Sequence, residues 1–437
     1  MLAISRTPLA AFKGHFFTPR GLQGINHLIQ AEMKDSAELR TATLSKDLKE
    51  ISKVSSLPAL SRLRIPQSIW VPLIDNLEVS SIDHLGTAIR QYSDWKEVPS
   101  LFSFGPRVTV NSDSPFNKEE ILVQLRNILG MHSIENGEFS LRVDHDQKMS
   151  LSFNAIPPRP WLDSPLALTM AERSVDWWSV QGRDGTDTSR PAEPSETAIK
   201  LYRNEGSLSC LCAAFLRSSS IPSLLKSKAP DEVLVWDPFV GNGAMILELL
   251  QLVRDSGIGQ SPKTVTIVGN VKSKESLDIC VRRIEKWLSA CGESVTVADH
   301  EDAGQRAGRR SARRKDDETE TTLSGLFSKS FQVGKGIEIN VHLTTVSFQE
   351  TFPHVKGGVM VSHIPKTYNE LTGIDKHELS EWAAFGNLLK NSEISSAMFF
   401  TETNSFMKYA KLRYAKLVHL VSPNGKSIGH FSKGIPF

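Results

Sequence analysis

The stretch VLVWDPFVGNGAMILELL, residues 233–250, carries the clearest fold signal in the chain. Four apolar residues precede Asp237, a turn with Gly241 and Gly243 follows, and apolar residues then recur at helical spacing. This order predicts a strand, a tight turn and a helix. Two glycines at such a turn let backbone N–H groups and a helix N-terminus approach a ligand closely. The motif alone leaves open whether the turn binds a ligand or only connects two elements.

The same alternation of strand and helix continues along the rest of the chain. From about residue 197 onward, short apolar runs such as TVTIVGN alternate with amphipathic stretches such as KESLDICVRRIEKWLSA. This pattern predicts a parallel α/β sheet. The first half differs, because strand-like pieces such as FSLRV and MSLSFNAI lie among fewer helices, which favours an α+β arrangement.

Composition limits the classes of function. At 437 residues the chain is long enough for two or three domains, and 40% hydrophobic with 23% charged residues indicates a folded protein. The net charge of +2 means that any RNA-binding surface must be local. Four cysteines without matching histidines predict no metal site and favour a reducing compartment. No apolar run approaches the ~20 residues that cross a membrane, so we expect no membrane partner.

Two segments differ from the folded parts in composition. Residues 1–14 are basic and contain no acid, which is compatible with a transit peptide and with an ordinary N-terminus. We expect a mitochondrial or other organellar matrix location, with the cytoplasm as the alternative. Residues from about 299 to 330 are charged and poor in apolar side chains, so we expect a disordered insertion.

Several segments together resemble the THUMP-domain RNA methyltransferases, which methylate guanine exocyclic amines using S-adenosylmethionine. The motifs that carry this resemblance lie in the family's order: HFFTPRGLQGINHLIQAEM, LRIPQSIWVPL, LYRNEGSLSCLCAAFLR, DPFVGNGAMILE and FGNLLKNSEISSAMFFTETNSFMKYAKLRYAKLVHLVSPNG. The resemblance implies a ferredoxin-like and a THUMP-like region followed by a Rossmann-like class I methyltransferase domain. The implied segments are a targeting segment at 1–14, the ferredoxin-like domain at 15–96, the THUMP-like domain at 97–185 and the methyltransferase domain at 186–437.

The resemblance also implies a cofactor site. Asp237, Phe239, Gly241 and Gly243 match the family's cofactor motif, with Asp237 as acceptor for the cofactor's ammonium. The next strand ends in GNVKSKES, where relatives have an acid that accepts from the ribose hydroxyls. Of the three residues at the strand end, the Asn270 side chain can still accept a hydrogen bond, whereas those of Val271 and Lys272 cannot. We therefore expect S-adenosylmethionine to bind weakly or not at all.

The catalytic signature departs further from the family. Relatives carry Asn-Pro-Pro-Tyr after the fourth strand, where the Asn and a proline carbonyl hold the target amine and the ring stacks on the flipped base. In SHIPK of this chain, His363 stands for the Asn, Ile364 and Pro365 for the prolines and Lys366 for the aromatic residue. His363 and Pro365 are the candidate catalytic residues of a degenerate motif.

Three functions follow as hypotheses. The first is an RNA-binding protein on a methyltransferase scaffold that has lost its chemistry and acts on ribosomal RNA or in (mito)ribosome assembly, with structured RNA and assembly proteins as partners. The second is an active S-adenosylmethionine-dependent rRNA or tRNA guanine methyltransferase. The third is a cofactor-sensing interaction protein that binds no RNA.

Overall fold

The computed structural model describes residues 12–17, 25–154 and 208–434, the last two ranges with internal gaps of which 92–106, 298–326 and 365–375 are the longest. The chain forms two compact units, Met1–Gly21 with Ile25–Pro158 and Leu22–Gly24 with Arg159–Phe437. Most of the predicted insertion and residues 1–11 lie outside the described residues. Strand β12 begins at Phe327, a few residues before residue 330, which is the approximate end predicted for that insertion.

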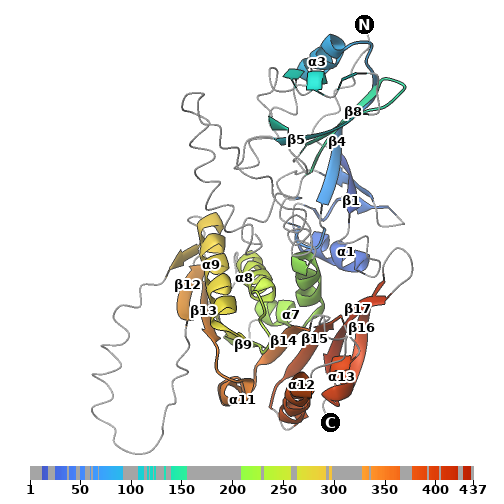
Figure 1. Ribbon diagram of the computed structural model, residues 1–437. Helices are drawn as coiled ribbons and strands as arrows, with labels where there is room; N and C mark the ends of the chain where they lie inside the picture. The colour runs from blue at the N-terminus through green and yellow to red at the C-terminus, as the bar shows by residue number, and fades with distance from the viewer. Residues whose placement is uncertain are drawn as a thin grey trace, which may run out of the picture. The chain divides into compact units, whose positions relative to one another are not determined.

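Unit 1 is built on a single sheet in its described part (Figure 1). The strand order is β2-β3-β1-β4-β8-β7-β5-β6. The long central strand β4 pairs antiparallel with β1 on one side and with β8 on the other, so the segments 15–96 and 97–185 share this sheet. The assignment of these segments as ferredoxin-like and THUMP-like stays a prediction. The elements of unit 1 are β1 Phe12–Phe17, α1 Asn26–Asp35, β2 Thr43–Leu44, β3 Glu50–Val54, β4 Ser68–Glu78, α3 Ile82–Gln91, β5 Arg107–Ser112, β6 His132–Ser133, β7 Phe139–Val143 and β8 Lys148–Asn154.

A buried carboxylate anchors helix α1 within unit 1. Glu32 is only 3% exposed, and its two oxygens accept from the backbone N–H groups of Arg64 (2.9 Å) and Ile65 (3.1 Å). Charge-assisted bonds of this kind satisfy two backbone donors in the bend before β4. Arg64 itself is also buried, with 8% of its surface exposed.

Unit 2 is a twisted, mixed sheet between two layers of helices, in which the central strands are parallel and the strands at both edges are antiparallel (Figure 1). The strand order is β11-β12-β13-β10-β9-β14-β15-β17-β16. The elements are α7 Ile221–Lys226, β9 Glu232–Asp237, α8 Ala244–Ser256, β10 Lys263–Asn270, α9 Lys274–Cys291, β11 Val295–Val297, β12 Phe327–Val333, β13 Ile337–Thr344, α11 Phe348–Thr351, the 3₁₀ turn η7 Phe352–His354, β14 Val359–Ile364, α12 Lys376–Lys390, β15 Ser396–Thr401, α13 Ser405–Tyr409, β16 Tyr414–Val421 and β17 Ser427–Gly434.

The order of the parallel strands identifies the fold of unit 2. Counted along the chain from β9, the parallel strands β13-β10-β9-β14-β15 lie in the order 3-2-1-4-5, and β17 adds antiparallel to β15. This is the Rossmann order, in which the direction of winding reverses between β9 and β14. The predicted Rossmann-like α/β fold is therefore confirmed.

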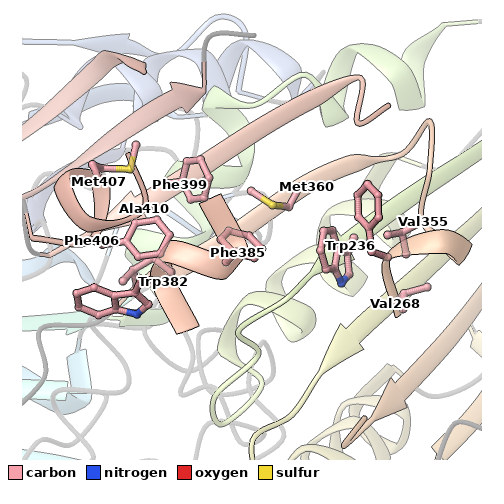
Figure 2. Close-up of a cluster of buried hydrophobic side chains, with 12 residues drawn as sticks. Trp236, Val268, Val355, Met360, Trp382, Phe385, Phe399, Phe406, Met407 and Ala410 are labelled. Carbon is pink, nitrogen blue, oxygen red and sulfur yellow. The ribbon is translucent and has the colours of Figure 1, made fainter. Parts of the chain in front are cut away.

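Side chains of alternate strand residues form a core on each face of this sheet. One face carries Trp236, Met360 and Phe399, which pack with α12 and α13 in a cluster rich in aromatic rings (Figure 2). In Figure 1, α8 and α9 lie on the opposite side of the sheet from α12 and α13. Gly386 of α12 has room for no side chain, because an added Cβ would lie 1.8 Å from the carbonyl oxygen of Ala410. Helix α12 therefore packs directly on the backbone that follows α13.

Candidate functional site

The glycine turn after β9 is fixed by helix α9. Gly241 and Gly243 have φ angles of +56° and +86°, which L side chains rarely adopt. The Arg283 guanidinium of α9 donates to the carbonyl oxygen of Asn242 at 2.7 Å, and an added Cβ on Gly243 would meet the Cys280 Sγ at 3.0 Å. The turn is thus held close against α9, and both glycines are required by its geometry.

Asp237 lies at the carboxyl end of β9, beside the point where the winding reverses. It is 1% exposed. Its Oδ1 accepts from the Ser362 hydroxyl of β14 at 2.6 Å and from the Phe239 backbone N–H at 3.1 Å. Among the described residues, its Oδ2 has no hydrogen-bond partner, and the atom is buried. Burial raises the pKa of Asp237 to about 7, against the lowering effect of those two hydrogen bonds.

The Asn270 side chain at the end of β10 is occupied by contacts within the protein. Its Oδ1 accepts from the Trp236 indole N–H at 2.8 Å, and its Nδ2 donates to the Val346 carbonyl at 3.0 Å and to the Thr351 hydroxyl at 2.6 Å. The residue is 7% exposed. These bonds join the end of β10 to the segment that enters α11. A ribose hydroxyl would have to share Oδ1 with the indole or displace it.

His363 forms a pair with Glu402 at the carboxyl ends of β14 and β15. Its Nε2 lies 3.3 Å from the Glu402 Oε1, and the two side chains are 14% and 18% exposed. The imidazole stacks on the Phe400 ring, with centroids 4.5 Å apart and planes inclined by 29°. The backbone N–H of Glu402 donates to the carbonyl of Ile364 at 3.1 Å, which continues the β14–β15 pairing to the level of this pair.

The fold therefore brings most of the predicted site residues to one edge of the sheet. Asp237 and His363 lie on the two strands that flank the winding reversal, where α/β folds bind ligands. Phe239 packs against the aromatic cluster, with its centroid 5.0 Å from that of Phe385. Pro365 lies outside the described residues. Their roles as catalytic and cofactor-binding residues stay predictions.

Sequence reasoning missed two members of this edge. Ser362, next to His363, is buried and bonds to Asp237, and Glu402 pairs with His363 from the next strand. The signal for Glu402 is present in the sequence as an acid directly after the apolar strand SAMFFT. Its significance appears only when β14 and β15 are known to be neighbours.

The thiols near this edge are not set up as nucleophiles. Burial, followed by the charges of Glu248, Asp237 and Glu402, raises the pKa of Cys212 well above its ordinary value. Burial likewise raises the pKa of Cys280 to about 12. A thiol must ionise to act as a nucleophile or metal ligand, so both groups are inert near neutral pH. The described residues contain no group of three or more His, Cys, Asp or Glu side chains that would hold a metal.

The site fits a cofactor such as S-adenosylmethionine only in part. The positive-φ glycine turn gives the close backbone approach that such a ligand needs. The acceptors do not fit, because the free Asp237 oxygen is enclosed and the Asn270 amide is committed to internal bonds.

Among the described helices, none is long and apolar enough to cross a membrane.

No protein-family model matches the chain, and no curated protein is similar to it. Several solved structures are similar over almost its whole length. They include SMU.472, a candidate methyltransferase complexed with SAH (11% identity, TM-score 0.45, 98% of both chains). A possible methylase from Clostridium difficile 630 matches at 10% identity with a TM-score of 0.44, over 98% of both chains. A predicted N6-adenine-specific DNA methylase from Listeria monocytogenes str. 4b F2365 matches at 11% identity with a TM-score of 0.46, over 98% of this chain and 97% of that one.

Proposed function

We propose that this chain is an RNA-binding protein on a methyltransferase scaffold that no longer transfers methyl groups, and that it acts on ribosomal RNA or in ribosome assembly. The observation that carries the proposal is that the hydrogen-bond acceptors at the carboxyl ends of β9 and β10 are buried or already bonded within the protein. The Oδ2 atom of Asp237 is enclosed, and the side-chain amide of Asn270 is hydrogen-bonded to Trp236 and Thr351. A buried polar atom that is already bonded costs free energy to redirect toward a ligand.

The end of β14 supports the same proposal. Transfer to an exocyclic amine needs an acceptor that holds the amine and a ring that stacks on the base. In this chain the aromatic surface beside His363 belongs to Phe400, which is fully buried and contacts Phe431 at 5.3 Å between centroids. That ring packs in the core and stacks on the histidine, so it is not free to stack on a nucleobase.

RNA binding is proposed from the resemblance of the N-terminal half to THUMP-containing enzymes, and mitochondrial or other organellar location from the basic first residues. Binding through phosphate contacts falls with salt, with a log–log slope of about −0.7 to −0.9 per contact. Filter binding of the full chain to structured rRNA at several salt concentrations should show such a slope. Crosslinks mapped by mass spectrometry should fall mainly in unit 1, and the absence of both would refute RNA binding.

The loss of chemistry has its own test. Calorimetric titration of the full chain with S-adenosylmethionine should show no binding at micromolar concentrations, and protein-depleted rRNA should receive no methyl groups. Low-micromolar affinity that disappears in Asp237→Ala would contradict the proposal.

A second candidate, an active methyltransferase for rRNA or tRNA guanine, is favoured by one observation. His363 and Glu402 form a paired acid–base group at the ligand-binding edge of the sheet. Methyl incorporation that is lost in His363→Ala would select this candidate over the first.

A further inference from the structure

The His363–Glu402 pair is better defined than a chance surface contact. Strand register places His363 beside Phe400, and the Glu402 N–H bonds to the Ile364 carbonyl one step further along. Gly429 of β17 also lies close to this point, because an added Cβ there would be 2.5 Å from the Thr401 carbonyl oxygen and 3.2 Å from the Glu402 Cα. The backbone that carries Glu402 is therefore held from both sides.

The orientation of the imidazole is fixed as well. Phe400 stacks on its ring, and the carboxylate of Glu402 faces Nε2. A carboxylate only accepts hydrogen bonds, so the contact requires a proton on Nε2. In the neutral ring the other nitrogen, Nδ1, must then carry the lone pair.

We infer that Glu402 is a positioning residue that holds His363 as the Nε2–H tautomer, so that Nδ1 forms a hydrogen-bond acceptor site at the carboxyl edge of unit 2. The site takes a neutral ligand group that donates an N–H or O–H. This inference goes beyond the proposed function and requires neither RNA binding nor methyl transfer.

The tautomer can be measured directly on the full chain. The protein contains 12 histidines, so ¹⁵N-histidine labelling gives a small set of imidazole signals, and His363→Gln identifies the one of interest. The wild-type spectrum near pH 8 should show a protonated Nε2 and an unprotonated Nδ1. Glu402→Gln should move the population toward the Nδ1–H tautomer, because the glutamine amide can donate to Nε2.

A reactivity measurement gives a second readout. Diethyl pyrocarbonate acylates an imidazole nitrogen only through a lone pair that solvent reaches. Mass spectrometry should detect modification of His363 in the wild type. The modification rate should be about fivefold lower in Glu402→Gln, because the loss of one net hydrogen bond shifts the tautomer population by about that factor.

A matched control lies in the segment that enters β15 at its other end. Glu393 is exposed and lies 3.9 Å from Lys356. Glu393→Gln makes the same change of charge and should leave both readouts of His363 unchanged. A wild-type Nδ1–H tautomer, or a tautomer that is the same in Glu402→Gln, would overturn the inference. Because no RNA or cofactor is added, neither result depends on the proposed function.

Discussion

Asp237 makes the stability of unit 2 depend on pH in an unusual direction. Its pKa is raised by burial from 3.8 to about 7, so the folded state holds the proton more tightly than the unfolded state does. Stability is therefore greatest at low pH and falls as pH rises from about 4 to about 7. One pKa unit corresponds to about 1.4 kcal/mol, so the full penalty above about pH 8 is about 4 kcal/mol.

The substitution Asp237→Asn tests this number because the amide stays neutral at every pH. At about pH 5 the wild type already bears between one and two kcal/mol of the penalty, so the gap between variant and wild type should widen by about 3 kcal/mol between about pH 5 and pH 8.5. The difference between the two pH values cancels any fixed cost of the amide, such as a buried N–H without a partner.

The assay is urea unfolding monitored by tryptophan fluorescence, since Trp236 and Trp382 are buried in the same unit. Asp278→Asn, an exposed position on α9, serves as control and should change the free energy of unfolding by no more than about 0.5 kcal/mol at both pH values. A gap that stays constant between the two pH values would refute the reasoning that burial controls the Asp237 carboxyl.

Three further outcomes are expected. Burial, with smaller contributions from neighbouring cations, lowers the pKa of His430 to about 4, so its contribution to stability is complete above about pH 6.5 and is lost as pH falls toward 4. His430→Gln should flatten that acid limb of the stability curve by at most about 3 kcal/mol in urea unfolding. Gly386→Ala should destabilise unit 2 by several kcal/mol in thermal unfolding, because its Cβ would overlap the Ala410 carbonyl. Gly357→Ala meets no atom of the described residues within 4 Å and should cost only backbone strain from its φ of +77°. Glu32→Gln should cost about 1.5–3 kcal/mol and increase hydrogen exchange of the two amides that its carboxylate binds, and unchanged exchange would contradict that role.

The sequence by itself determined the local elements of unit 2 and much of its architecture. The apolar run before Asp237, the glycine turn and the helical spacing after it predicted β9, the turn and α8. The alternation of such units requires parallel strands with crossover helices, and only a few strand orders satisfy that requirement. The placement of Asp237 and His363 near one edge follows from the same rule, because parallel strands all end on the same side.

The tertiary structure alone decided what each of these side chains does. The sequence left Asn270 as a weak acceptor for a ligand, and its use by Trp236 and Thr351 depends on residues 34 positions before and 81 positions after it. The raised pKa of Asp237 depends on burial, and the pairing of His363 depends on Glu402, 39 positions away on a neighbouring strand. Local sequence patterns encode periodicity and turns, whereas hydrogen-bond partners and desolvation are set by which distant segments pack together, and a single sequence does not contain that information in readable form.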